Sequence, residues 1–190
     1  FVSLGFTYDP KTRRRRNTYL FSARLRHSRY AYREAVYDQK QRTFFRCHIH
    51  AFEFITGVPK KVVPDNLRAA VVQASVEEPV INRVYQRLAI HYGFLISPCL
   101  PATPKHKGGV ENDIKYVKHN FWPLYKERER QQGHEVPYAE DLQRELQRWS
   151  SEVAHTRTIK GVGRRPVDIF REEEHASLLP LPLTRWNQVA

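Results

Sequence analysis

The order of strand-like and helical segments constrains the fold of this 190-residue chain more than any other feature. Three segments rich in β-branched and aromatic residues come first, joined by short turns, and this pattern is typical of an antiparallel meander. Helical and strand-like patterns then alternate. Strands are predicted over 1–6, 18–25, 30–36, 59–63 and 94–97, and helices over 38–56, 82–92, 111–132 and 138–153. We therefore predict an α/β fold, with a mixed sheet that joins the three-strand antiparallel meander to parallel strands and has helices on both faces.

Capping and breaking residues give the expected helix ends. Asp38 is the expected N-cap of the first helix and Gly57 its stop, while Gly93 ends the second helix. Pro123 should disturb the third helix, because proline removes a backbone hydrogen bond. Pro166 is placed to open a short acidic helix near the C-terminal end.

The pattern also suggests a division of the chain. We expect residues 1–133 to form the core, since hydrophobic residues make up 41% of the sequence. Residues 134–156 should add a helix that packs on the core or extends from it. Residues 157–190 are basic and proline-rich, and they are expected to connect toward a missing C-terminal domain.

The composition favours a nucleic-acid partner. The formal net charge is +12, and an excess of this size attracts polyanions. No apolar run approaches the roughly 20 residues that a membrane span needs, so no membrane partner is expected. Cys47 and Cys99 do not make a disulfide framework, which favours a reduced, cytoplasmic protein. His48 and His50 adjoin Cys47, but one helix would spread these side chains around its axis, so a zinc site is not expected.

The segment 101–118 is the strongest candidate for chemistry. A basic loop with prolines and glycines is expected to run into a helix that starts near Glu111. Glu111, Lys115 and Lys118 have the spacing i, i+4, i+7 and therefore share one helix face. The carboxylate could hold a divalent cation, and the lysines could hold a polyanion beside it. A surface helix with an ordinary Glu–Lys pair is the alternative.

Asp65 is the second candidate acid. It follows the predicted strand at Val62 and Val63, and ligand sites in open α/β sheets cluster at the carboxyl ends of strands. Asp65 and Glu111 could meet at one sheet edge and hold Mg²⁺ (or Mn²⁺), the ion type used in phosphodiester chemistry. The alternative is that Asp65 caps a helix starting near Leu67.

Basic residues elsewhere are candidates for DNA contacts. The turn after Asp9 holds Arg13, Arg14, Arg15 and Arg16 with no acid among them, which favours phosphate contact over a solvated hairpin tip. The loop before Glu111 adds three more candidates: Lys105, His106 and Lys107. Together with Lys115 and Lys118, these are the expected DNA-binding residues.

Seven stretches resemble a known family. They cover 18–25, 28–32, 47–52, 62–66, 91–98, 103–111 and 163–166. Along these stretches the chain resembles the RNase H-like catalytic core of DDE transposases and retroviral integrases, and it is most similar to the IstA class of bacterial insertion-sequence transposases. The resemblance implies that Asp65 and Glu111 are the second and third acids of the catalytic triad. The family has its first acid just before a stretch like 1–4, so the resemblance implies that this acid lies immediately upstream of Phe1. Asp9 is the nearest substitute, but it precedes a proline in a turn and is better explained as a turn former.

The resemblance also implies an activity and partners. Such proteins use divalent metal ions to cleave DNA 3′ ends and transfer the strand into target DNA, act as homo-oligomers, and work with a helper AAA+ ATPase. They are cytoplasmic bacterial proteins that join the nucleoid when bound to DNA. Two alternatives stay open: a nuclease of the same fold that only hydrolyses, and a non-catalytic DNA-binding or assembly fragment.

Overall fold

Two compact units make up the chain. The computed structural model describes residues 1–64, 71–73, 80–97 and 104–187, without the side chains of 71–73, 80 and 104–108. One unit combines Phe1–Gln39 with Gly109–Phe170, and the other combines Lys40–Gly108 with Arg171–Ala190. Within the described part of the chain, no helix has the length and apolar character needed to cross a membrane. The predicted division into core, added helix and connector stays a prediction, because compact units defined by contacts are not necessarily domains.

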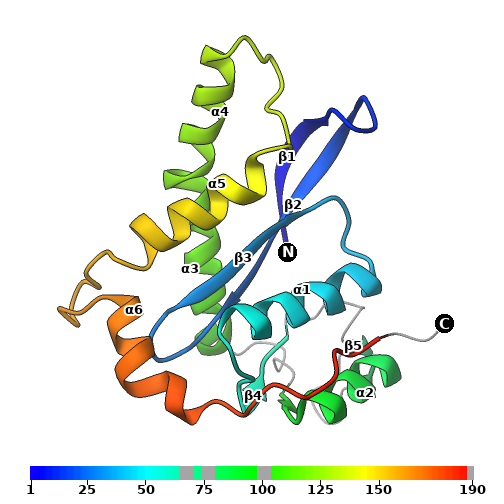
Figure 1. Cartoon of the computed structure of the whole chain (residues 1–190), viewed down its shortest axis with the longest axis vertical. Coiled ribbons are helices and arrows are strands. Elements are labelled where there is room, and N and C mark those ends of the chain that lie inside the picture. Colours follow the sequence, from blue (N-terminus) through cyan, green and yellow to red (C-terminus); the bar gives the residue numbers. More distant parts are fainter. Residues whose placement is uncertain (65–70, 74–79, 98–103, 188–190) are drawn as a thin grey trace. The chain divides into compact units, whose positions relative to one another are not determined.

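The first unit contains the predicted meander (Figure 1). Strands β1 (Val2–Asp9), β2 (Arg14–Arg24) and β3 (Ala31–Val36) form an antiparallel sheet in the order β1–β2–β3. The register of β1 against β2 shifts between Ser3 and Gly5, and Gly5 has φ +97°, as a bulge with a glycine in the left-handed region requires.

Both strands of the first hairpin are longer than predicted, and this corrects the placement of the arginine run. β1 continues to Asp9, and Asp9 pairs with Arg14. Arg14, Arg15 and Arg16 therefore lie in β2, and only Arg13 stays in the turn, with φ +53°. The turn is thus shorter than predicted and covers residues 10–13, between Asp9 and Arg14.

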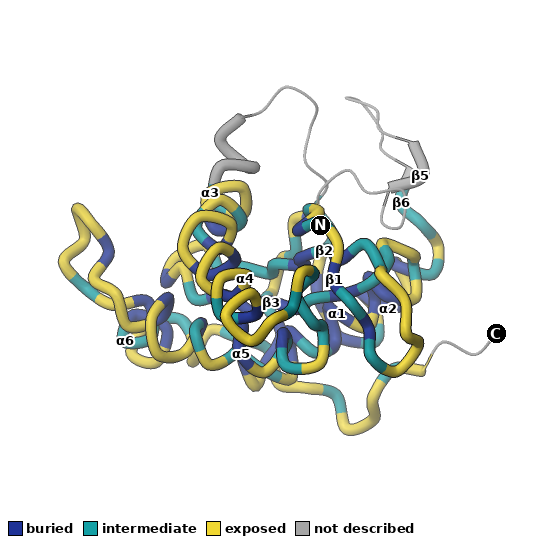
Figure 2. The backbone as a smooth tube through the Cα atoms, turned by 90° about the horizontal axis from the view of Figure 1, so that it is seen from above, coloured by how far each residue is buried: buried dark blue, intermediate teal, exposed yellow. Residues whose placement is uncertain are grey.

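Three helices cover the sheet of this unit. They are α3 (Pro104–Asn120), α4 (Trp122–Gln131) and α5 (Leu142–Trp149), and α5 continues into the π-helix η1 (Ser150–Ala154). Their apolar side chains join two sheet residues in one core: Leu4, Leu20, Val117, Phe121, Trp122, Tyr125, Leu142 and Leu146. Figure 2 shows that α3 and α4 expose the side that faces away from this core. Apolar burial on one face and charge on the other explain why these segments form helices only against the sheet.

Two helix starts differ from the predictions in this unit. The break expected near Pro123 is confirmed, since α3 ends at Asn120 and α4 has Pro123 in its first turn.

The predicted basic loop before Glu111 is wrong: α3 already begins at Pro104, in keeping with the preference of proline for a first helical turn. The helix predicted over 138–153 begins later, at Leu142. Beyond it, Pro166 opens α6 (Pro166–Ile169) as expected.

The second unit contains the remaining strands and two helices. Its elements are α1 (Gln41–Phe54), β4 (Lys61–Val62), β5 (Val71–Gln73), β6 (Val80–Ile81), α2 (Arg83–Tyr92) and β7 (Leu95–Ile96). β4 pairs with β7 in parallel, so the predicted parallel strands are confirmed. The β5–β6 antiparallel pair was not predicted. Among the described strands, the sheets of the two units form separate hydrogen-bonded groups.

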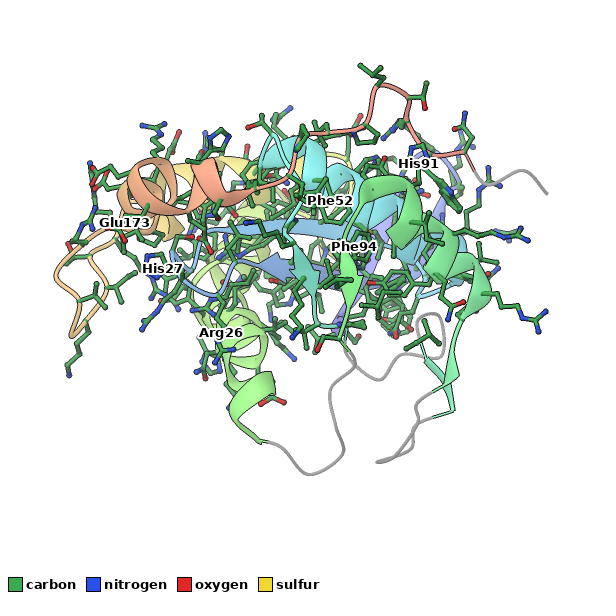
Figure 3. The ribbon with its side chains drawn as sticks, turned by 90° about the horizontal axis from the view of Figure 1, so that it is seen from below. Arg26, His27, Phe52, His91, Phe94 and Glu173 are labelled. Carbon is green, nitrogen blue, oxygen red and sulfur yellow. The ribbon has the colours of Figure 1, made fainter. Side chains whose placement is uncertain are left out.

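Aromatic packing holds α1 against α2 and against Phe94, which follows α2. Phe45 stacks on Tyr85 with ring centroids 5.8 Å apart, and Phe52 meets Phe94 at 5.5 Å. Figure 3 shows Phe52 and Phe94 directed toward each other. The start of α1 differs from the prediction, because the helix begins at Gln41, after Asp38. Its last residue is Phe54, and the turn that ends it contains Thr56 with φ +53° and a hydrogen bond from the Gly57 N–H to the carbonyl oxygen of Phe52.

The C-terminal segment packs along the second unit. After η2 (Phe170–Glu174) and η3 (His175–Ser177), the chain is extended, and Val58 and Leu179 exchange backbone hydrogen bonds of 2.8 Å. Gly57 makes this approach possible, because a Cβ atom there would lie 2.8 Å from the Cβ atom of Leu178. Trp186 then packs edge-on against Phe45 at 5.6 Å.

The ends of α2 agree with the sequence and yield a test. The Asn82 side chain accepts hydrogen bonds from the backbone N–H groups of Val84 and Tyr85, and Gly93 ends the helix with φ +78°. Asn82→Ala should lower the free energy of unfolding by about 1 kcal/mol, because two N–H groups lose their acceptor. Chemical denaturation would measure this loss. Asn82→Asp keeps the cap and is the control; equal stability of the two variants would contradict the capping role.

Candidate active site and nucleic-acid interface

The exposed face of α3 carries the predicted acid and lysines. Glu111, Lys115 and Lys118 all lie in α3 and all are exposed, so the predicted helix face is confirmed. Val117 and Phe121, on the other side, are buried in the core. The helix therefore presents one carboxylate and two ammonium groups to solvent, while its opposite face packs in the core.

A buried ion pair fixes that opposite face. Asp113 is 6% exposed and binds both Nε and Nη2 of Arg33, with 3.0 Å from Nε to Oδ2. Ser22 donates to the same carboxylate at 2.7 Å, and Arg33 Nη1 donates to Ser150 Oγ at 3.0 Å. The network therefore ties α3 to β2, β3 and η1. Because Asp113 is two residues after Glu111, the network also sets the direction in which Glu111 points.

The environment keeps Asp113 charged and a neighbouring histidine neutral. Burial opposes ionisation of Asp113, but the charge of Arg33 and hydrogen bonds from Arg33 and Ser22 outweigh it and lower its pKa. Burial and the charge of Arg33 lower the pKa of His155 to about 4. His155 Nε2 lies 2.9 Å from the carbonyl oxygen of Ala31 and 3.4 Å from both the Ala31 backbone nitrogen and Arg33 Nη1. The site thus has one charge pair and a neutral ring.

Only part of the predicted metal site lies among the described residues. Glu111 offers an exposed carboxylate, a donor that suits Mg²⁺ or Mn²⁺. Asp65 lies outside the described residues, so its distance from Glu111 stays a prediction. Across the described residues, no group of three or more His, Cys, Asp or Glu side chains could hold a metal ion. Cys47 and His48 are buried in the second unit, and burial lowers the pKa of His48 to about 4.

The predicted arginine run divides into two kinds of residue. Arg13, Arg14 and Arg15 are exposed. Arg16 lies 3.4 Å from Asp9 through an Nη1–Oδ2 ion pair, and its guanidinium carbon is 3.9 Å from the ring centroid of Tyr37. Arg16 therefore stabilises the hairpin, and the three preceding arginines project the charge.

Asp9 has the contacts of a turn former. It is 6% exposed, and its carboxylate accepts hydrogen bonds from the backbone N–H of Lys11 at 3.0 Å and from Thr12 Oγ1 at 2.9 Å. The Thr12 hydrogen bond leads the causes that lower the pKa of Asp9. These contacts agree with the structural interpretation of Asp9 and offer no support for a role as the first acid.

The remaining predicted DNA contacts lie at the start of α3. Lys105, His106 and Lys107 are helical residues, and their side chains are outside the described part of the structure. Their role in DNA binding stays a prediction.

Sequence reasoning missed Arg33 and Asp113. A signal existed for both, because each charged residue occupies a position in phase with buried neighbours: Arg33 is two residues from Ala31 in β3, and Asp113 is four residues before Val117 in α3. A charged residue in phase with buried neighbours predicts its own burial and the need for a partner, but it does not identify that partner.

Comparison with known proteins relates the chain to transposases. No family model matches it. A candidate transposase of Mycobacterium tuberculosis is 35% identical over 190 residues, which cover 97% of this chain and 44% of that protein. The transposase for insertion sequence element IS21 of Pseudomonas aeruginosa is 33% identical over 140 residues, which cover 73% of this chain and 33% of that protein. The chain thus spans less than half the length of these two relatives.

A solved structure shares the fold. A chain in the cryo-EM structure of the simian T-cell lymphotropic virus intasome, in complex with PP2A regulatory subunit B56 gamma, matches with a TM-score of 0.65. The sequence identity is 13%, and the match covers 97% of this chain and 57% of that chain. At this identity the match shows the fold alone, and it confirms the predicted integrase-like fold class.

Breaking the buried pair should unfold the first unit. Asp113→Asn leaves Arg33 charged in the interior, so we expect the free energy of unfolding to fall by about 3–5 kcal/mol in chemical denaturation. Asp141→Asn, which loses only a surface ion pair to Arg144, is the matched control and should cost about 1 kcal/mol or less. The double variant Arg33→Met, Asp113→Leu should recover much of the loss. Equal unfolding midpoints for the two single variants would contradict the anchoring role of Asp113.

Stability should also depend on pH through the buried histidines. In the unfolded chain His48 and His155 bind a proton below the ordinary histidine pKa of 6.5, whereas the folded protein resists protonation down to a pKa of about 4. Unfolding therefore takes up protons in this window, and stability should fall as the pH drops from 6.5 toward 4. Denaturation at a series of pH values would show a flatter profile for His155→Gln. His119→Gln, at an exposed position, should leave the profile unchanged.

Proposed function

We propose that this chain is the catalytic core of a DNA transposase, because it is 33–35% identical to two bacterial transposases over at least 73% of its length and has an integrase-like core fold. Its reaction is 3′-end cleavage of the element followed by transfer of that strand into target DNA. The observation that carries the proposal is the exposed face of α3, where Glu111 stands in line with Lys115 and Lys118 on a helix anchored from behind.

The acids of this site would hold a divalent ion, Mg²⁺ or Mn²⁺. Glu111 supplies one carboxylate, and Asp65 supplies a second by analogy with the family. When bound, the ion offsets the negative charge that develops on a phosphodiester under attack. Two carboxylates without a cation would repel the same phosphate, so the acids and the ion act together.

The lysines of α3 would bind and orient the DNA. One and two turns along from Glu111, Lys115 and Lys118 can each contact a non-bridging phosphate oxygen through Nζ. In the first step water attacks the phosphorus at the element end and releases a 3′-hydroxyl. In the second step that hydroxyl attacks a target phosphodiester, and the broken strand leaves with its own 3′-hydroxyl. Both steps are phosphoryl transfers, and no protein side chain forms a covalent bond to DNA.

Further basic residues would extend the DNA surface. Arg13, Arg14 and Arg15 project from the first hairpin and can reach the backbone of a duplex. Lys105, His106 and Lys107 precede Glu111 in α3 and are proposed to contact DNA near the reacting phosphate. Arg16 has a structural role in the hairpin and is left out of this surface.

The complete protein would act in a larger assembly. We propose that it works as a homo-oligomer with a helper AAA+ ATPase, in the bacterial cytoplasm and on the nucleoid. Both partners follow from the family resemblance alone.

The test of the active site is Glu111→Gln in the full-length protein. This change removes the charge of one acid and keeps its size, so joining of donor ends to target DNA should fall at least 100-fold, while DNA affinity stays within about twofold. A gel assay that pairs labelled donor ends with target DNA would measure cleavage and joining separately. Glu127→Gln, at an exposed acid paired with Arg130 in α4, is the control and should join strands normally.

The same assay separates the alternatives. Donor cleavage without joining would identify a nuclease of the same fold. Joining that survives Glu111→Gln would refute the catalytic role of this acid. DNA binding by wild-type protein without cleavage or joining, in the presence of Mg²⁺ or Mn²⁺, would identify a non-catalytic assembly module.

A further inference from the structure

An arginine at the end of β2 occupies a notch in α3. A Cβ atom built on Gly109 would lie 2.5 Å from Nη1 of Arg24. The guanidinium can therefore rest against the helix only because residue 109 has no side chain. Burial of Arg24 is partial, so part of its donor edge stays within reach of solvent.

Two exposed arginines lie near Arg24. Arg29 is in the turn between β2 and β3, where it has φ +62°, and Figure 3 shows Arg26 and His27 on the same turn. Arg157 follows η1, and its guanidinium carbon is 3.7 Å from the ring centroid of Tyr116 in α3. The Tyr116 ring holds one face of that guanidinium, which leaves its edge for hydrogen bonds.

Positive charge exceeds negative charge in this cluster. Burial lowers the pKa of Arg24, the charge of Asp113 opposes this, and the charges of Arg29, Arg33 and Arg157 add to it. Asp113 already receives hydrogen bonds from Arg33 and Ser22. Several guanidinium groups therefore surround one carboxylate that already has its hydrogen-bond donors, and this excess of positive charge favours an anionic ligand. A phosphodiester has two non-bridging oxygens that can accept the paired N–H groups of a guanidinium.

The cluster lies on a different side of α3 from the proposed active site. Gly109 precedes Glu111 by two residues, which turn an α-helix through about 200°. Tyr116 follows Glu111 by five residues and is displaced by about 140°. A DNA segment bound here is therefore distinct from the phosphates that Glu111, Lys115 and Lys118 would meet.

We propose that Arg24, Arg29 and Arg157 form a second phosphate-binding site for duplex DNA, with Gly109 as the residue that admits Arg24. The site rests on the proposed function in that its ligand is DNA, and it adds a second DNA contact to the same core. A small polyphosphate would also match the positive charge. The three arginines are spread over a strand end, a turn and the segment after η1, and this spread suits the repeating phosphates of a DNA backbone better.

The test measures binding of a labelled random-sequence duplex to the full-length protein as a function of salt concentration. Arg24→Ala should weaken binding and reduce the slope of log affinity against log salt by about one. Gly109→Ala changes no charge, but its Cβ displaces the Arg24 guanidinium, so it should reduce the slope similarly. The double variant should match Arg24→Ala. Arg144→Ala, an exposed arginine paired with Asp141, should bind like wild type.

Each outcome decides the inference. Wild-type affinity and slope in both Arg24→Ala and Gly109→Ala, with normal circular dichroism, would overturn the site. A further loss when Gly109→Ala is added to Arg24→Ala would overturn the role of the glycine notch. Normal DNA binding by the arginine variants together with inactive Glu111→Gln would overturn the second site and leave the transposase proposal standing. Failure of the wild-type protein to bind the duplex would overturn both.

Discussion

The ion pair between Arg33 and Asp113 is the contact on which the first unit depends. An aspartate on the inner face of α3 and an arginine in the middle of the sheet are each costly to bury alone, so neither charge can be removed without destabilising the other. Their bidentate geometry fixes both the height and the rotation of α3. The buried ion pair therefore determines the direction in which the exposed helix face with Glu111, Lys115 and Lys118 points. The direction of an exposed helix face is set here by a buried polar contact.

Much of the fold follows from local sequence. The three-strand meander, the caps of α2 at Asn82 and Gly93, and the break at Pro123 each depend on residues within one or two turns of the element they shape. The errors lie where distant packing decides. α1 begins at Gln41, after Asp38, and α3 reaches back to Pro104 although glycines weaken its first turns.

The candidate site was predictable to the same extent. Helical spacing alone places Glu111, Lys115 and Lys118 on one face, since that relation is internal to a helix. The partnership of Arg33 with Asp113 joins residues 80 positions apart, and no local pattern pairs them. The arginine run was partly predictable. The sequence shows its positive charge, but only the register of β1 and β2 shows that Arg13–Arg15 are exposed while Arg16 contacts the hairpin.

The two units are threaded through each other along the sequence. The first needs residues up to Phe170, and the second gains its final strap only with the segment that carries Leu179 and Trp186. The first unit ends at Phe170, so its residues leave the ribosome before the strap of the second unit that carries Leu179 and Trp186. Loss of that strap would remove the backbone hydrogen bonds to Val58 and the Trp186 contact with Phe45, and so expose apolar side chains of the second unit to chaperones and proteases.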